Sequence, residues 1–174
     1  KLYLDISEES PDSVPHFLKS CEHLLALNPD STIIRETLIQ LYTKAMQPSK
    51  AINHIRTLLD RQALALDSAI AQLKELLSIF PQTHDIQLLL VECYIRHNDF
   101  LDAVTLLRDI YTITDDLLVC RLLDQILVKQ DDFGPAYQLY SDFYFHKCEF
   151  PKSLEYVRKL MQLGTKDNEF IGQR

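Results

Sequence analysis

Two histidine arrangements provide the residue types that metal binding or acid–base chemistry requires. His146 and Cys148 lie two positions apart near an expected helix junction, and His16 and His23 lie seven positions apart on one expected helix. In a metal-binding helix motif such as HExxH, two histidines lie four residues apart, so that both imidazoles project from the same face. Neither arrangement has that spacing. We therefore expect partly exposed or core histidines at these positions, and no metal site.

Two adjacent acidic pairs, Asp115-Asp116 and Asp131-Asp132, are the candidates for acid–base catalysis. Both fall just before or between expected helices, where a carboxylate is favoured by the positive end of the helix dipole. We therefore interpret them as helix caps. The chain also lacks a GxSxG motif, a Walker motif and a calcium-loop spacing. The sequence predicts no catalytic residue, no metal and no cofactor, and so a protein that is not an enzyme.

Glycine content and charge exclude two further classes of protein. The chain has only three glycines among its 174 residues, whereas phosphate-binding loops and dinucleotide fingerprints need glycine where the backbone approaches a ligand. Its net charge is −7, and no three consecutive residues are Lys or Arg. Nucleic-acid-binding proteins show a basic patch or stripe instead. We expect neither a nucleotide-binding fold nor a nucleic-acid partner.

The cysteines and the apolar stretches bear on the location of the protein. No apolar stretch approaches the roughly 20 residues that span a bilayer, so we expect no direct membrane insertion of this fragment. The chain opens at Lys1 rather than at methionine, which suggests a piece of a longer protein whose signal peptide or anchor could lie upstream. The four cysteines lie far apart without a CxxC pair, as reduced thiols packed in helices would. We expect a cytoplasmic location.

The apolar spacing predicts an all-α protein. Apolar residues recur at i, i+3, i+4 and i+7 in almost every window, and the alternation typical of strands is absent. Helix-breaking residues and caps, such as Asp30 or Ser31 and the prolines Pro48 and Pro151, divide the chain into helices. The expected helices are 12–27, 32–46, 49–62, 66–80, 84–97, 99–112, 116–130, 135–147 and 150–163. Connections this short require antiparallel neighbours.

Three stretches of the chain can be superimposed on one another. Each carries a tyrosine followed nine residues later by a small residue, in the pairs Tyr42 and Ala51, Tyr94 and Ala103, and Tyr144 and Ser153. Self-similarity of this kind marks a stacked repeat array. We expect such an array to hold a partner rather than to transform a substrate.

The pattern resembles the tetratricopeptide repeat, a 34-residue helix-turn-helix unit. The first stretch places Leu38, Tyr42, Ala51 and Ile55 at positions 7, 11, 20 and 24 of that repeat. The resemblance implies a right-handed solenoid of about nine antiparallel helices, which would occupy residues 12–165 between an N-terminal extension (1–11) and a C-terminal tail (166–174). A small residue at position 20 lets the two helices of a unit approach each other.

The spacing of the three stretches departs from a regular tandem array. Ala51 and Ala103 lie 52 residues apart, and Ala103 and Ser153 lie 50 apart, whereas tandem repeats would give 34 or 68. One extra helix falls in each interval, at about 66–80 and 116–130. The array therefore uses either three-helix units, as armadillo-like solenoids do, or degenerate tetratricopeptide-like repeats in which the extra helices pair with their neighbours. We favour the second arrangement.

The resemblance also implies which residues contact a partner, because the first helix of each pair lines a concave groove in that family. Carried over position by position, and joined by Tyr137 from the aromatic helix, the predicted partner-binding residues are Glu36, Gln40, Lys44, Leu88, Glu92, Arg96, Tyr137, Asp142 and Phe145. Chaperone-binding members grip a terminal carboxylate with Lys at position 5 and Asn at position 9. Those positions here hold Glu36 and Gln40, then Leu88 and Glu92. We expect no tight binding of an acidic chaperone tail.

Residues 136–147 form the most aromatic segment of the chain. Tyr137, Tyr140 and Tyr144 share one helix face, while Phe143 and Phe145 point to opposite sides. A helix packed between two neighbours explains most of this arc. Phe145 or Tyr137 could instead project into the groove as an anchor, since aromatic residues are favoured hot spots.

These observations predict a non-catalytic scaffold that binds a peptide or a helical segment of a partner protein in its concave groove. A recurrent acidic surface formed by Glu22, Glu36, Glu75, Asp85 and Glu92 would favour a basic or amphipathic ligand if these residues lie on one side. Two alternatives stay open. The chain could be a docking or regulatory domain of a larger enzyme, or a self-association module that forms a homo-oligomer through an uncovered end of the array. The tail containing Phe170 and Ile171 is a candidate cover for such an end.

Overall fold

The structure, a computed structural model, describes the backbone of residues 14–171 and the side chains as far as residue 164. The predicted extension 1–11 and the side chains of Phe170 and Ile171 lie outside the described residues. Within this range the chain forms helices and no strands. The helices are α2 (Val14–Leu27), α3 (Thr32–Lys44), α4 (Pro48–Asp60), α5 (Leu66–Ile79), α6 (His84–His97), α7 (Phe100–Ile110), α8 (Asp116–Lys129), α9 (Gly134–His146) and α10 (Phe150–Ile171).

The all-α prediction is confirmed, and all but one of the observed helices match their expected ranges to within a few residues. The exception is the last helix, which was expected to end at residue 163 but continues to Ile171. Gly164 lies inside this helix. A single glycine costs a helix interior only about 1 kcal/mol relative to alanine. No proline follows it to end the helix.

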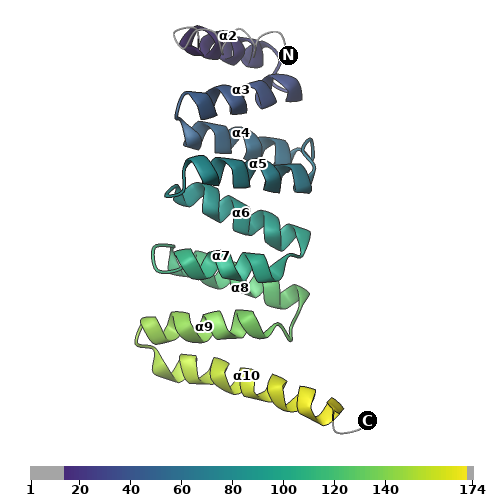
Figure 1. The fold of residues 1–174 in the computed structure, drawn as a ribbon, viewed down its shortest axis with the longest axis vertical. Helices are drawn as coiled ribbons and strands as arrows, with labels where there is room; N and C mark the ends of the chain where they lie inside the picture. Colours follow the sequence, from purple (N-terminus) through teal and green to yellow (C-terminus); the bar gives the residue numbers. More distant parts are fainter. Residues whose placement is uncertain (1–13, 172–174) are drawn as a thin grey trace. The chain divides into compact units, whose positions relative to one another are not determined.

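The chain forms two compact units, Lys1–Leu90 and Val91–Arg174, and the division falls within α6. In the first unit α2 packs on α3, α3 on α4, and α4 on α5. In the second unit α9 packs on both α8 and α10, and α7 also packs directly on α9. Figure 1 shows that consecutive helices within each unit run in alternating directions. Each unit is therefore a stack of antiparallel helices, as in α-helical solenoids.

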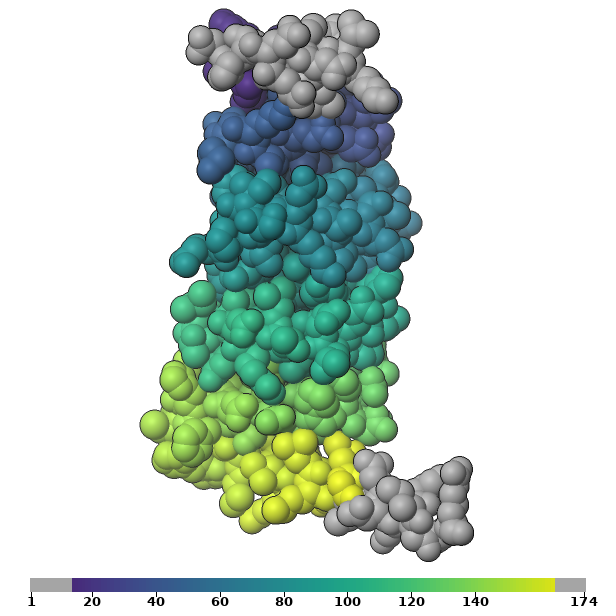
Figure 2. All heavy atoms as spheres, viewed as in Figure 1, coloured from purple at the N-terminus to yellow at the C-terminus, as the bar shows by residue number. Residues whose placement is uncertain are grey.

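One apolar face of each helix forms the core of its unit. In the first unit Leu38 and Ile55 are fully buried, as are Leu107, Leu123 and Leu139 in the second. On the face of the molecule drawn in Figure 2, the side chains of neighbouring helices fill the space that the ribbon leaves open within each unit. The two units are thus built in the same way from short amphipathic helices.

The small residues of the three repeated stretches lie where the two helices of a pair meet. Ala51 and Ala103 have no exposed surface, and Ser153 is 6% exposed. In the α9–α10 pair the hydroxyl of Ser153 donates to the carbonyl of Ser141 at 3.0 Å, and the two hydroxyls are also 3.0 Å apart. Larger side chains at these three positions would separate the helices. The expectation that small residues permit the close approach is consistent with this burial.

Four of the helix ends share one turn geometry. A residue one or two positions after the helix end has a positive φ, at Met46 (56°), Gln62 (54°), Asn98 (70°) and Cys148 (59°). The following amide then donates to a carbonyl five residues back, as from Asp99 to Tyr94 at 2.9 Å. This is the Schellman arrangement, in which glycine is the usual residue. None of these four positions is glycine.

Candidate functional site

The first unit contains a groove of about 710 Å³ between α3 and α5, which we call the α3–α5 groove. From α3 it is lined by Glu36, Ile39, Gln40, Thr43 and Lys44. From α5 and the residues just before it the groove is lined by Leu64, Ser68, Gln72, Glu75, Leu76 and Ile79. Three of the predicted partner-binding residues, Glu36, Gln40 and Lys44, therefore lie together on one wall.

The α3–α5 groove has an apolar floor and a polar rim. Ile39 and Leu76 are buried in the floor, at 6% and 3% exposure. Glu36, Gln40 and Glu75 are exposed at the rim, and the two carboxylates form no ion pair with the described residues. The side-chain oxygen of Gln72 is buried and accepts no hydrogen bond from the described part of the protein. A groove of this kind can bury apolar side chains of a ligand on its floor and can offer the ligand hydrogen-bond acceptors at its rim.

The α5 wall of this groove was not predicted as a partner-binding surface. The helix at 66–80 was treated as an extra element between two signature pairs, so Gln72 was not considered and Glu75 was counted only as a member of the recurrent acidic surface. The signal that could have identified them is the order of the helices. In an antiparallel stack, helices two apart in the chain lie on the same side, as α7 and α9 do in the second unit.

The second unit contains a groove of about 590 Å³ between α6 and α8, which we call the α6–α8 groove. The end of α6 contributes Ile95 and Arg96. The outer face of α8 contributes Leu117, Cys120, Arg121, Asp124, Gln125, Val128 and Lys129. Arg96 is the only one of the predicted residues on this groove. The residues of α8 were missed, although Leu117, Arg121, Asp124 and Val128 follow the i, i+4, i+7, i+11 spacing of a single helix face.

The remaining predicted residues are placed separately. Leu88 is half-buried on the part of α6 that belongs to the first unit, and Glu92 is half-buried on the part that belongs to the second. Asp142 is exposed on α9. Neither of the two grooves described above is lined by these residues.

The two candidate aromatic anchors differ in their surroundings. The ring of Tyr137 lies 6.2 Å from that of Tyr156 on α10, and its hydroxyl donates to the carbonyl of Asp131 at 2.6 Å. Tyr137 is thereby engaged within the unit. Phe145 is 64% exposed, and among the described residues its ring meets that of Phe150, which is itself 56% exposed. Of the two candidates, Phe145 is the one whose ring remains accessible.

Tyrosines between α8, α9 and α10 form a stacked cluster. The ring of Tyr140 lies 4.5 Å from that of Tyr156, at an interplanar angle of 11°. The single hydroxyl proton of Tyr140 is shared between a carboxylate oxygen of Asp124 at 2.6 Å and the carbonyl of Cys120 at 2.8 Å. Burial, and then the hydrogen bond to Asp124, raise the pKa of Tyr140 well above its ordinary value. Burial likewise raises the pKa of the Cys120 thiol, which makes it a poorer nucleophile.

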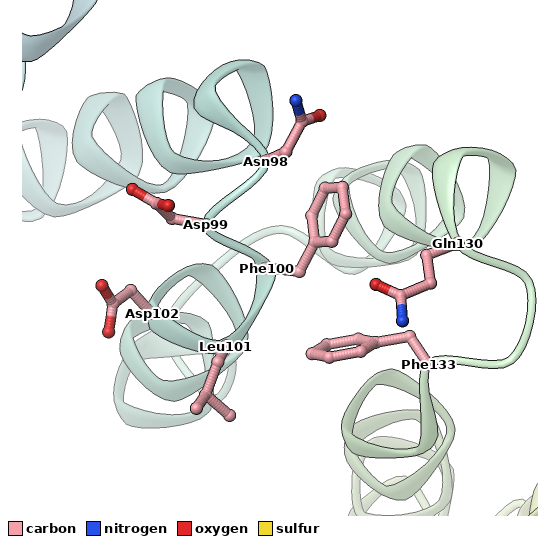
Figure 3. Close-up of a pocket in the computed structure, with 7 residues that line it drawn as sticks. All are labelled: Asn98, Asp99, Phe100, Leu101, Asp102, Gln130 and Phe133. Atoms are coloured by element: carbon pink, nitrogen blue, oxygen red, sulfur yellow. The ribbon is translucent and has the colours of Figure 1, made fainter.

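A third hollow, of about 360 Å³, lies where the α6–α7 and α8–α9 turns meet. Figure 3 shows the rings of Phe100 and Phe133 facing each other there, with the side chain of Gln130 beside them. Their centroids are 5.9 Å apart in an edge-to-face arrangement. The side chains of Asp99 and Asp102 point away from the rings. The contact between these two rings joins the α6–α7 and α8–α9 turns, so we interpret the hollow as a packing feature.

The residues first considered for chemistry do not converge. Asp115 caps α8 by accepting hydrogen bonds from the amides of Leu117 and Leu118 at 3.1 and 3.2 Å, so its interpretation as a cap is confirmed. The expectation that Asp131-Asp132 cap α9 is wrong. The N-cap of α9 is Phe133, and its side chain makes no capping bond. Among the described residues no group of three or more His, Cys, Asp or Glu could hold a metal ion.

None of the helices, as far as the structure describes them, is both long and apolar enough to cross a membrane. No curated protein is similar enough to the chain to count as a match. Among solved structures the chain is similar to the crystal structure of MamA, at 13% identity and a TM-score of 0.30, over 94% of this chain and 95% of that chain.

The family model of the tetratricopeptide repeat matches residues 62–111. This segment contains α5, α6 and α7, so it includes one of the two helices that had been counted as extra. The match favours degenerate repeats over three-helix units in this part of the chain. The resemblance to tetratricopeptide-like helical repeats is thereby confirmed for residues 62–111.

Proposed function

We propose that this chain is a non-catalytic scaffold that holds a peptide or a helical segment of a partner protein in the α3–α5 groove. One observation carries the proposal. Glu36, Gln40 and Lys44, which were predicted to bind a partner because of their positions in the repeat, line a groove that has an apolar floor. Concave surfaces of stacked helical repeats serve as extended binding faces.

The chemistry of the groove supports a ligand with both apolar and hydrogen-bonding groups. Ile39, Leu76 and the 43% exposed Ile79 offer apolar surface. The unpartnered oxygen of Gln72 can accept a hydrogen bond from a ligand amide, which removes the cost of leaving a buried acceptor unsatisfied. Glu36 and Glu75 favour a basic residue in the ligand over an acidic one. This charge supports the expectation that an acidic chaperone tail does not bind here.

A peptide library displayed on phage would test the proposal. Peptides selected on the chain should lose at least about tenfold in affinity for the Gln40→Arg variant, because a long cationic side chain would fill the groove and repel a basic ligand. The matched control is Asn53→Arg, which adds the same side chain at an exposed position of α4. Peptides that bind both variants as well as the wild type would refute the assignment, as would a library from which nothing is enriched.

The alternatives make different predictions about assembly and context. Self-association predicts a mass in light scattering that rises with protein concentration, whereas the scaffold proposal predicts a constant mass. A docking domain of a larger enzyme would bind through the same kind of groove, so the sequence of the full-length gene product would distinguish it. All four cysteines carry free thiols, which supports a reducing compartment, and we propose the cytoplasm.

A further inference from the structure

The outer face of α8 carries two aliphatic side chains that do not contribute to the core. Leu117 is 81% exposed and Val128 is 87% exposed. The core face of the same helix is formed by Val119, Leu122, Leu123 and Ile126, all at most 1% exposed. Leu117 and Val128 are eleven residues apart, which places them on the same side of the helix and roughly 16 Å apart along its axis. Together with Ile95 they line the α6–α8 groove.

Positive charge surrounds this apolar line. Arg96 and Arg121 are exposed and form neither a hydrogen bond nor an ion pair with any residue that the structure describes. Lys129 donates to two neutral acceptors, the carbonyl of Ile95 at 2.7 Å and the side-chain oxygen of Asn98 at 2.9 Å. The one carboxylate on the groove, Asp124, accepts the hydroxyl of Tyr140. Three cations therefore face one anion, although the chain as a whole has a net charge of −7.

The charge of the α6–α8 groove is opposite to that of the α3–α5 groove, where Glu36 and Glu75 face Lys44. Two grooves of opposite charge do not favour the same ligand, because unlike charges attract and like charges in a desolvated contact repel strongly. The α6–α8 groove therefore requires an explanation of its own. Its arginines are available to a ligand without first breaking a bond to the protein.

We propose that the α6–α8 groove binds an acidic amphipathic helix of a partner protein. Apolar side chains of that helix, spaced over about three turns, lie along Leu117, Ile95 and Val128. Carboxylates that flank this apolar face pair with Arg96 and Arg121, and arginine can bind a carboxylate through two parallel hydrogen bonds. The proposal does not depend on the α3–α5 groove, since the two grooves share no residue.

An acidic helix is favoured over nucleic acid as the occupant. A nucleic-acid strand offers a regular row of phosphates and is bound by many cations, and its affinity comes mainly from them. Here three cations are interleaved with exposed aliphatic side chains, and the groove contains no exposed aromatic ring on which a base could stack. Aliphatic contacts between charge pairs are typical of a helix lying in a groove.

The test uses three synthetic helical peptides that share one apolar face, with leucine at i, i+4, i+7 and i+11. Their flanking positions hold glutamate, glutamine or lysine. Fluorescence anisotropy with the full chain should show the glutamate peptide binding at least about tenfold more tightly than the glutamine peptide. The lysine peptide should bind more weakly still. Equal affinity of the glutamate and glutamine peptides, or no binding of the glutamate peptide, would overturn the proposal.

Variants of the chain test whether the glutamate peptide binds in the α6–α8 groove. Arg121→Glu and Leu117→Ser change exposed side chains without a bond to the described protein, and each should weaken the glutamate peptide at least about tenfold. Arg121→Glu should also improve binding of the lysine peptide. The control is Arg56→Glu, the same charge reversal at an exposed position of α4 in the first unit. Loss of binding with Arg56→Glu would show that only net charge matters, and unchanged binding with Arg121→Glu would show that the peptide does not bind in this groove; either result would refute the proposal.

Two further measurements separate this proposal from its competitors. Gln40→Arg should leave the glutamate peptide unaffected, so that failure of the α3–α5 groove and failure of this one are distinguishable. A single-stranded oligonucleotide should not displace the bound peptide. Displacement at a comparable concentration would identify the surface as a nucleic-acid site and would refute the proposal.

Discussion

Replacing Tyr140 with phenylalanine should reveal a stability difference that reverses with pH. Tyr140 is 2% exposed, and its single hydroxyl proton is shared between Asp124 at 2.6 Å and the Cys120 carbonyl at 2.8 Å. Phenylalanine keeps the ring that stacks on Tyr156 but removes this shared hydrogen bond. At neutral pH we expect the free energy of unfolding to fall by about 2 kcal/mol, since one of the two acceptors is charged.

The sign of the pH dependence follows from the direction of the pKa shift. Burial raises the pKa of Tyr140 in the folded state above the value of about 10 that it has in the unfolded chain. Below about pH 10 both states keep the phenolic proton, and the stabilising contribution is complete. Above that pH the unfolded chain loses the proton while the folded chain keeps it. The free energy of unfolding therefore falls by about 1.4 kcal/mol per pH unit for this one group.

The Tyr140→Phe variant lacks this titrating group, so its stability should fall less steeply above pH 10. Tyr42 and Tyr144, whose pKa values are also raised by burial, remain and still lower its stability. The two stability curves should converge by about pH 11.5, where the lost slope equals the roughly 2 kcal/mol of lost hydrogen bonding. Urea unfolding at a series of pH values, followed by far-UV circular dichroism, measures both curves.

A matched control separates titration from simple destabilisation. Ile126 is fully buried on α8, and Ile126→Val should cost about 0.5–1.5 kcal/mol by removing one methylene. Its curve should stay parallel to that of the wild type at every pH, because no titrating group has changed. If the stability curve of Tyr140→Phe also stays parallel to that of the wild type above pH 10, the Tyr140 hydroxyl ionises equally well in the folded and unfolded states. The inference that burial and the hydrogen bond to Asp124 raise its pKa would then be wrong.

Three further substitutions probe the surface, the turns and the helix contacts. Phe145→Ala should weaken partner binding while lowering the free energy of unfolding by less than about 1 kcal/mol. The control is Phe143→Ala, at a 2% exposed position, which should lower the free energy of unfolding by about 3–5 kcal/mol. Equal losses of the two variants in urea unfolding would place Phe145 in the core. Gln62→Gly should raise the free energy of unfolding slightly, because φ is 54° there and glycine adopts this conformation without strain. Arg56→Gly, at an exposed position inside α4, should lower the free energy of unfolding by about 1 kcal/mol, and a loss in both variants would contradict strain at Gln62. Ser153→Leu should lower the free energy of unfolding by about 1–3 kcal/mol, because the larger side chain overpacks the contact between α9 and α10. Ser153→Ala should lower it by no more than about 1.5 kcal/mol, through the lost hydrogen bond. A larger loss for the alanine variant than for the leucine variant would mean that hydrogen bonding, rather than size, governs this position.

The helices could be predicted from the sequence because their limits are set locally. Ser31 caps α3 by accepting from the amide of Ile34 at 3.4 Å, and Pro48 lies in the first turn of α4. Such signals act over a few residues and are legible in the chain. The end of α10 lacks them, and its expected limit was wrong. The turns with positive φ carried no glycine signal either, so Met46 and Cys148 could not be recognised as their turning points.

The grooves could be predicted only in part, because each needs two helices that are not consecutive in the chain. The resemblance provided the α3 wall through Glu36, Gln40 and Lys44 but said nothing of Gln72 and Glu75 opposite. Exposed residues such as Leu117 and Val128 also carry no constraint from the core, so the periodicity that identifies a buried face does not single them out. Leu117 and Val128 become candidate binding residues only because α6 forms the other side of their groove.

The turn geometry explains why α5, one of the two apparent extra helices, belongs to the same stack as the signature helices. Met46, Asn98 and Cys148 each follow a signature tyrosine by four residues, yet Gln62 adopts the same left-handed conformation after α4, where no signature tyrosine precedes it. The turn from α4 into α5 is thus of the same kind as the turns within the signature pairs. An antiparallel stack needs only short amphipathic helices and tight reversals, and the signature residues add close approach at particular pairs. The α3–α5 and α6–α8 grooves each lie between helices two positions apart, so the proposals made above give the exposed residues of α5 and α8 the same part in binding as those of α3 and α6.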